Sequence, residues 1–282
     1  TCQLSTQPVS DRPGNHHLHF HPATHSLKII AMTSPIAIIG GTGLASLDTL
    51  KITHRETQST PYGEPSSPII HGELNGRAVV FLARHGHHHT FPPHKINYRA
   101  NLWALHRIGV RQIIAVAAVG GIRDDMAPGV LAFPDQLVDY TWGRHSTFFE
   151  DNLSHVTHID FTEPYCPKLR ARLIEAARAL DLAVRESCTY AAMQGPRLET
   201  AAEIRKLERD GCDIVGMTGM PEAALARELG LRYATCAVVA NWAAGKVAGE
   251  ITMAEIERNL QEGMTWVEAL LGQVVPMLEE QS

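Results

Sequence analysis

Arginine and histidine stand side by side at the end of an apolar segment of this sequence. In LARHG (82–86), Arg84 and His85 follow apolar residues typical of a strand. A guanidinium offers a planar fork of N–H donors that fits an oxyanion, and an adjacent imidazole can add a donor. The pair therefore indicates an anion-binding site.

Two threonines in glycine-rich segments could complete such a site. Thr42 lies in GGTGL (40–44), a turn after a strand, where backbone N–H groups can approach an anion closely. The dinucleotide-binding GxGxxG spacing is absent, so an anion site and a plain tight turn are the two interpretations. Thr218, in GMTGMPEAA (216–224), precedes a helix; its hydroxyl could contact an anion or cap that helix, and capping is the commoner role.

Two further side chains could read the polar edge of an organic ligand. Asn241 ends the apolar run CAVVAN (236–241), where an amide either bonds its own loop or contacts a ligand. Glu199, in MQGPRLET (193–200), precedes a helix start, where the helix dipole alone would favour a carboxylate. The residues by themselves leave both alternatives open.

A run of histidines, HGHHH (85–89), suggests a metal centre at first sight. No aspartate, glutamate or cysteine is spaced with it as a ligand set, and a loop before Pro92 and Pro93 is poorly organised to form one. A solvated basic loop explains His87 to His89 equally well. We therefore expect no metal in the functional site.

Alternating strand and helix patterns carry these residues from residue 35 onward. Strands are expected at 36–41, at 67–84 around an Asn-Gly turn, and at 112–121. Helices are expected at 98–109, 166–182, 200–211, 221–230 and from about 252 to 280. The pattern predicts a single α/β domain over residues 32–282, with a largely buried mixed sheet flanked by helices.

The bulk composition is that of an ordinary globular protein, with 282 residues, 44% hydrophobic, 20% charged and a net charge of −5. The mild acidity argues against nucleic acid as a partner, and no apolar stretch reaches the roughly 20 residues that a membrane span needs. Five scattered cysteines without a CxxC pair indicate a reducing cytoplasm. Residues 1–31, rich in His, Pro, Ser and Thr, are expected to be a disordered extension rather than a metal-binding tail.

Six segments together resemble the trimeric purine nucleoside phosphorylases, in particular their methylthioadenosine phosphorylase branch. They are IIGGTG (38–43), LARHG (82–86), YRANLWAL (98–105), TEPYCPKLR (162–170), QGPRLET (194–200) and GMTGMPEAALARELG (216–230). The family cleaves an N-glycosidic bond with inorganic phosphate. The resemblance therefore implies a pentosyltransferase that uses phosphate as co-substrate and no cofactor, on a mixed sheet curved into a distorted barrel.

The resemblance also assigns roles to individual residues. It implies a phosphate site made of Thr42, Arg84, His85, Thr218 and a backbone N–H near Ala117. Ala117 stands where the methylthioadenosine branch usually has threonine. Met217 is expected under the ribose and Leu198 against the base. His158 resembles a residue donated by the neighbouring subunit, which implies a homotrimer.

The base pocket departs from the methylthioadenosine branch. Asn241 and Ala243 replace two aspartates that read the 6-amino group and N7 of adenine, and Glu199 stands where inosine- and guanosine-cleaving members bind the base. An ionised carboxylate can accept the N1 hydrogen of hypoxanthine, but it would face a bare lone pair on N1 of adenine. The resemblance therefore implies a 6-oxopurine.

The 5′ end of the ligand points back to the methylthio branch. Met253 falls near the position of a histidine that contacts the 5′-hydroxyl in inosine-cleaving members, and a thioether suits a methylthio group, although a core position at a helix start explains it as well. We therefore expect phosphorolysis of S-methyl-5′-thioinosine in purine salvage. The alternatives are an inosine/guanosine phosphorylase, a methylthioadenosine phosphorylase, and a nucleoside-binding sensor, against which the complete phosphate set argues.

Overall fold

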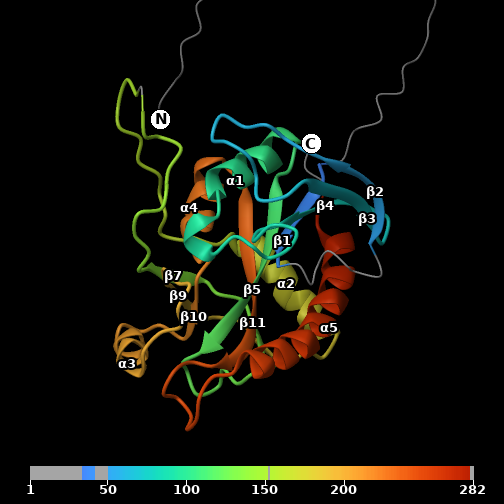
Figure 1. The fold of residues 1–282 in the computed structure, drawn as a ribbon. Coiled ribbons are helices and arrows are strands. Elements are labelled where there is room, and N and C mark those ends of the chain that lie inside the picture. The colour runs from blue at the N-terminus through green and yellow to red at the C-terminus, as the bar shows by residue number, and fades with distance from the viewer. Residues whose placement is uncertain (1–33, 42–49, 152, 280–282) are drawn as a thin grey trace, which may run out of the picture. The chain divides into compact units, whose positions relative to one another are not determined.

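The computed structural model describes residues 34–41, 50–151 and 153–279 (Figure 1). Thr42 and the N-terminal segment 1–31 lie outside the described residues. The strands are β1 (Ile36–Gly40), β2 (Lys51–Glu56), β3 (Ile69–Leu74), β4 (Arg77–Ala83), β5 (Gln112–Gly121), β6 (Leu131–Ala132), β7 (Gln136–Asp139), β8 (Val184–Arg185), β9 (Thr189–Ala192), β10 (Ile214–Gly216) and β11 (Arg232–Trp242). The helices are α1 (Tyr98–Arg107), α2 (Pro167–Ala179), α3 (Ala201–Arg209), α4 (Gly219–Glu228) and α5 (Met253–Met277), with a 3-10 turn η2 (Pro93–Lys95).

Strand β5 is the centre of the sheet. It pairs in parallel with β11 over its whole length, in parallel with β1 over its first part, and antiparallel with β10 at its end. Strands β4, β3 and β2 continue beyond β1, strands β9 and β7 continue beyond β10, and β6 and β8 continue beyond β11. The predicted mixed sheet is confirmed. It branches at β5 and does not close on itself among the described strands, so it is not a closed barrel.

The sheet is buried on both faces. Along β1, Ala37 and Ile39 belong to one hydrophobic core, and Ile36 and Ile38 belong to another. Helices α1 and α4 contribute to the first core, and α2 and α5 to the second. Burial on both faces explains why the strand sequences read as continuous apolar runs.

The predicted helices and the long strands form where the sequence indicates. Helix α3 begins with a capping box, in which Thr200 and Glu203 satisfy each other's backbone N–H groups. Asn75 and Gly76 link β3 to β4 with φ angles of 49° and 81°, as a tight hairpin turn requires. Strand β2 was not predicted because its residues are almost all exposed and have no apolar alternation. Among the described residues, no helix has the length and apolar character needed to cross a bilayer.

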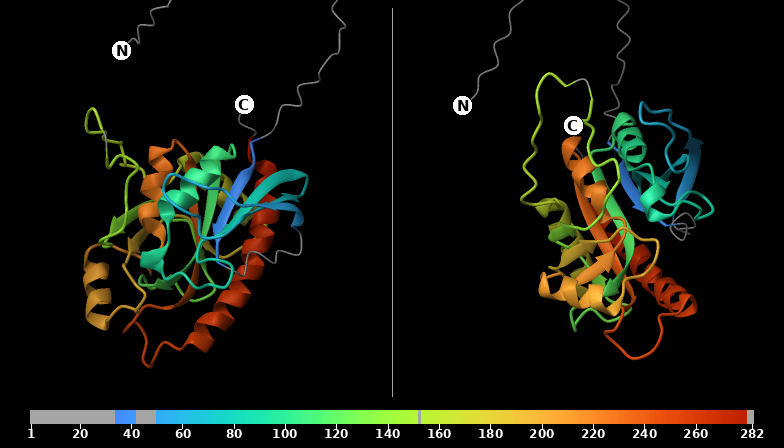
Figure 2. Two further views of the ribbon diagram at one scale, coloured as in Figure 1. Left: turned by 45° about the horizontal axis from the view of Figure 1, so that its top comes forward. Right: turned by 60° about the vertical axis from the view of Figure 1, so that its left-hand side comes forward.

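Two features of the domain stand out beyond its layers. The segment between β7 and α2 extends away from the rest of the domain in both views of Figure 2. Helix α5 packs mainly through its C-terminal half: apart from Gly263, its buried residues lie between Val267 and Val275, whereas residues 253–262 are exposed or half-buried. The N-terminal half of α5 therefore leaves space beside the sheet.

Candidate active site

A cavity of about 590 Å3 opens where β5, β11, α5 and several loops meet. Nine residues predicted from the sequence line it: Arg84, His85, Ala117, Leu198, Glu199, Met217, Thr218, Asn241 and Met253. Thr42 lies outside the described residues. His158 is exposed and does not line the cavity of its own chain.

The branching of the sheet creates this cavity. Strand β1 pairs with β5 as far as Ala115, and β10 pairs with it from Gly120. Residues 116–119 therefore have no strand partner on that edge within the described chain. Ala118 is exposed although it lies in the central strand, because it lines the cavity.

Arg84 is buried at one end of the cavity and is held by a carboxylate that the sequence analysis did not single out. Its Nε and Nη2 donate to the two carboxylate oxygens of Glu222 at 2.7 and 2.8 Å, and its Nη1 donates to the Val116 carbonyl at 3.0 Å. Burial alone would lower the pKa of Arg84, but the contacts with Glu222 outweigh it and the pKa is raised. Three of the five N–H donors are engaged, so two remain for an anion.

The hydrogen bonding of His85 differs from the expected one. Its Nδ1 lies 2.9 Å from the carbonyl oxygen of Phe91, and because a carbonyl only accepts, Nδ1 must carry the hydrogen. Burial lowers the pKa of His85 to about 4, and the nearby charge of Arg84 adds to this. At neutral pH, Nε2 is therefore an acceptor and not the predicted donor, so it would pair with a hydroxyl of a protonated oxyanion.

Backbone and hydroxyl donors complete this end of the cavity. The Val116 carbonyl accepts from Arg84, so it points to the open edge of β5. Backbone groups of residues two apart on a strand point to the same edge, so the Ala118 N–H also points there. This N–H is next to Ala117, where the sequence predicts a backbone donor. Thr218 is buried and precedes α4, but its side chain makes no capping hydrogen bond. Its hydroxyl is therefore not required by the helix, which favours the ligand-binding interpretation.

Glu199 and Asn241 line the same cavity, and Asn241 lies opposite Gly120, four residues along β5 from the Val116 carbonyl that Arg84 contacts. Burial raises the pKa of the Glu199 carboxyl, and its own backbone N–H only partly opposes that shift. The Asn241 amide donates to the Trp242 carbonyl at 2.7 Å, which is the loop contact considered as an alternative. This contact uses one of its two amide hydrogens and leaves Oδ1 and the other hydrogen available.

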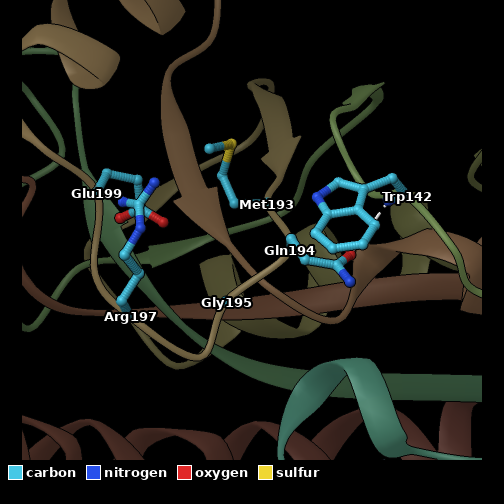
Figure 3. A pocket seen from close by; sticks show the side chains of 6 residues that line it. All are labelled: Trp142, Met193, Gln194, Gly195, Arg197 and Glu199. Atoms are coloured by element: carbon cyan, nitrogen blue, oxygen red, sulfur yellow. Dashed lines mark hydrogen bonds between the residues drawn. The ribbon is translucent and has the colours of Figure 1, made fainter.

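Glu199 also lines a second, smaller cavity of about 140 Å3. Figure 3 shows its lining side chains, with Glu199 beside Arg197 at one end and Trp142 at the other. The Trp142 backbone N–H donates to Gln194 there at 3.1 Å. Glu199 thus lines both cavities.

An apolar wall forms the remaining side of the large cavity. Four of its side chains come from α5: Met253, Ile256, Leu260 and Met264. A fifth, Ile251, precedes that helix. The exposed fraction of Met253 is 63% in this single chain, so it is not a core residue. This wall offers no charged group to a ligand.

A family model described as the phosphorylase superfamily matches residues 35–276. The chain belongs to this superfamily. It is 58% identical over 239 residues to a protein of Pseudomonas syringae pv. tomato named probable S-methyl-5′-thioinosine phosphorylase, covering 85% of this chain and 97% of that protein. It is 47% identical over 251 residues to a Thermococcus kodakarensis protein named probable 6-oxopurine nucleoside phosphorylase, covering 87% and 93%.

The fold agrees with solved structures of the superfamily. A methylthioadenosine phosphorylase from Schistosoma mansoni, in complex with adenine, superposes with a TM-score of 0.82 at 32% identity, over 86% of this chain and 91% of that one. The predicted single-domain nucleoside phosphorylase fold is thereby confirmed, and with it the assignment to the nucleoside phosphorylases, which are pentosyltransferases.

Sequence reasoning missed a side chain that holds this phosphorylase site together. Arg144 donates to the backbone carbonyls of Met193 and Gln194 on one loop, and to those of Met217 and Met220 on another. Its own segment follows β7 and carries no periodic pattern, so nothing in the sequence marks it. Only the folded structure shows that it joins the loops carrying Glu199 and Thr218.

Glycines allow the same two loops to approach each other. Gly195 has a φ angle of 60°, and a Cβ atom there would lie 2.4 Å from the sulfur of Met217. A Cβ atom at Gly216 would lie 2.1 Å from the hydroxyl of Tyr190. Gly195 therefore lets the two loops approach each other closely, and Gly216 lets β10 lie against the Tyr190 side chain of β9.

Proposed function

We propose that this phosphorylase cleaves S-methyl-5′-thioinosine with inorganic phosphate, giving hypoxanthine and 5-methylthioribose 1-phosphate. One observation carries the proposal: a single cavity is lined by anion-binding donors, by a half-buried carboxylate with an amide, and by an apolar wall. These three parts match the phosphate, the 6-oxopurine and the 5′-methylthio group. The relatives named as methylthioinosine phosphorylases, at 52–58% identity, support the same substrate.

The nucleophile would be held by Arg84, the Ala118 N–H, Thr218 and, as the sequence predicts, Thr42. The two remaining N–H groups of Arg84 meet the phosphate oxygens, while the bond to Glu222 keeps the guanidinium in place. His85 accepts the phosphate hydroxyl through Nε2, which leaves the unprotonated oxygens to attack the anomeric carbon. Positioning of this anion supplies much of the catalysis, since the reaction needs no covalent intermediate.

The leaving base would be read by Glu199 and Asn241. The carboxylate accepts the N1 hydrogen of hypoxanthine, and the free amide hydrogen of Asn241 donates to the purine as negative charge collects on it. Leu198 would lie against the base and Met217 under the ribose. These contacts favour 6-oxopurines over adenine, the base bound in the S. mansoni structure.

The second candidate is a 6-oxopurine nucleoside phosphorylase acting on inosine or guanosine, as named for the T. kodakarensis relative. The base-reading pair suits both candidates. The apolar wall of Met253, Ile256 and Leu260 distinguishes them, because it would leave a 5′-hydroxyl without a partner and would pack against a methylthio group. We therefore favour the methylthio substrate.

One assay tests the proposal. Release of free base is measured from methylthioinosine, methylthioadenosine, inosine and adenosine, each with and without phosphate. We expect methylthioinosine to have the highest kcat/KM and all turnover to require phosphate or arsenate. Undiminished release without phosphate would indicate a hydrolase, and a higher kcat/KM for inosine would favour the second candidate.

We further propose a homotrimer in the cytoplasm, working in purine salvage. The trimer would bring His158 of one chain to the ribose end of the next chain's cavity. The four described cysteines are unpaired, which fits a reducing compartment.

A further inference from the structure

Two histidines and a glutamate meet on the β2–β3 hairpin, among residues that the phosphorylase site does not use. His54 and Glu56 lie on β2, and His71 lies on β3 directly opposite His54 in the pairing register. One ligand atom from each residue lies within 4.8 Å of those of the other two. Among the described residues, no other group of three such side chains converges in this way.

The strand geometry explains the convergence. Residues two apart on one strand point to the same face, and the cross-strand neighbour of His54 joins them there. The rings of His54 and His71 stack with their centroids 4.1 Å apart, and His71 Nε2 lies 2.9 Å from Glu56 Oε2. The three side chains therefore occupy one patch of the sheet without any rearrangement of the backbone.

Neighbouring polar groups orient two of the three side chains. The Thr53 hydroxyl donates its only hydrogen to the His71 carbonyl at 3.1 Å. It can therefore only accept from His54 Nδ1, which lies 3.2 Å away, so Nδ1 carries the hydrogen and Nε2 keeps a free lone pair. The Gln58 amide donates to Glu56 Oε1, which leaves Oε2 toward His71. Such outer hydrogen bonds are typical of metal ligands.

We propose that His54, Glu56 and His71 bind a divalent transition metal, with zinc as the best fit. Two neutral imidazoles and one carboxylate are the ligand set of many three-residue zinc sites, and the exposed patch leaves room for water as the fourth ligand. Binding needs a free lone pair on His71 Nε2, so on a neutral ring the hydrogen shared with Glu56 moves to Nδ1 without release of a proton, and only an imidazolium ring would release one.

The metal would act as a clamp on the edge of the sheet and not as a catalyst. Strand β2 pairs only with β3 among the described strands, and its side chains are nearly all exposed, so little else holds this edge. None of the three ligands lines the active-site cavity. Occupancy should therefore raise the melting temperature and leave phosphorolysis unchanged.

The test must separate this site from the other histidines of the chain. We would use the full-length protein with His16, His17, His19, His21 and His25 replaced by serine, so that the N-terminal histidines do not compete for metal. Binding of Zn2+ is followed by calorimetry, and binding of Co2+ by its visible absorption, which reports the ligand geometry. The variants are His54→Ala, Glu56→Gln, His71→Ala and Thr53→Val. The matched control is His145→Ala, because His145 is exposed and lies 3.3 Å from Glu150 in a similar pair.

We expect one metal ion per chain in the serine background and in His145→Ala. Binding should be lost in the three ligand variants and weakened by about 10-fold to 100-fold in Thr53→Val, as for other outer-shell substitutions. Zinc should raise the melting temperature only where it binds. Absence of saturable binding, or binding that survives in His71→Ala, would show that the cluster is only a hydrogen-bonded surface pair and would overturn the proposal.

Discussion

Glu199 is half-buried and lines the active-site cavity, and within the described residues its carboxylate makes no ion pair, although the charge of Arg197 lies near it. Hypoxanthine offers that carboxylate a hydrogen on N1, whereas adenine offers a lone pair. A buried polar group without a partner costs about 1–3 kcal/mol, so the 6-oxopurine should be favoured by at least about 10-fold to 100-fold. Burial, which raises the pKa of Glu199, makes this preference sensitive to acid.

The first prediction concerns this preference. Glu199→Ser combined with Asn241→Asp should erode or reverse the ratio of kcat/KM for methylthioinosine to that for methylthioadenosine. Glu175→Ser, an exposed glutamate on α2, is the matched control and should leave the ratio unchanged. If Glu199→Ser alone does not alter the ratio, the carboxylate does not read the base.

The second prediction concerns His85 and pH. Burial lowers the pKa of His85 to about 4, below its ordinary value of 6.5, so the unfolded chain takes up a proton at a higher pH than the folded one. The free energy of unfolding contributed by His85 is therefore fully present above pH 6.5 and is lost as the pH falls to about 4, by at most roughly 1.4 kcal/mol per pH unit.

Urea unfolding in phosphate-free buffer measures this effect. His85→Asn can keep the hydrogen bond to Phe91 but cannot take up a proton, so its unfolding free energy should fall less between pH 6.5 and 4 than that of the wild type. His145→Asn serves as the control at an exposed histidine. Equal slopes for the wild type and His85→Asn would mean that burial does not suppress protonation of His85.

At the scale of elements, the sequence predicted what depends on local pattern. The helices have an apolar periodicity and the strands 36–41 and 112–121 are continuous apolar runs, so their places were predicted correctly. Strands β6, β8 and β10 have two or three residues each and exist only through their partners. The branching at β5, which opens the cavity, depends on which strand pairs with which half of β5, and no local pattern contains that information.

The same limit applies to the candidate site. Arg84, His85 and Thr218 were found from their residue types at the ends of predicted strands or the start of a helix, and from the segments that resemble a family. Glu222, which holds Arg84, lies 138 residues away along the chain, and Arg144 lies in an irregular segment. Their roles follow from distances in space, and a single sequence does not report those.

The third prediction concerns Arg144 as a positioning residue. Arg144→Met would leave up to four backbone carbonyls without a donor and free the loops carrying Glu199 and Met217 to shift. Displacement by about 1 Å can lower a rate by about 10²-fold, so kcat/KM for the nucleoside should fall by that order. Arg144→Lys keeps the charge but not the fork, and it should restore only part of the activity.

Steady-state kinetics with both substrates separates positioning from a general loss of structure. We expect kcat to fall and KM to rise for both the nucleoside and phosphate, because Arg144 holds the carbonyls of Met217 and Met220 on either side of Thr218. The melting temperature of each variant is measured alongside. An unchanged kcat/KM in Arg144→Met would show that the loops keep their places without this side chain.

At the scale of the whole molecule, the segment after β7 exposes more apolar surface than an isolated soluble chain usually does. It extends away from the domain (Figure 2) and exposes large apolar side chains, with exposed fractions of 73% for Trp142 and 72% for Val156. Exposed apolar groups of this kind are typical of surfaces that bind another protein. His158 lies on the same segment and does not line the cavity of its own chain. The proposed trimer would explain both features, because a neighbouring chain would cover the apolar surface and receive His158 at its ribose site.

The fourth prediction tests whether His158 acts across that interface. His158→Ala and Arg84→Lys are each expected to have low activity, the latter because lysine keeps the ion pair with Glu222 but loses the fork. The two variants are then co-expressed. If His158 serves the neighbouring chain, a site is intact when its own chain keeps Arg84 and the neighbouring chain keeps His158. In a cyclic trimer assembled at random, about one quarter of the sites satisfy both conditions. Activity should therefore return to about that fraction, with light scattering confirming a trimer, whereas activity no higher than the mean of the two variants would mean that His158 does not act in trans.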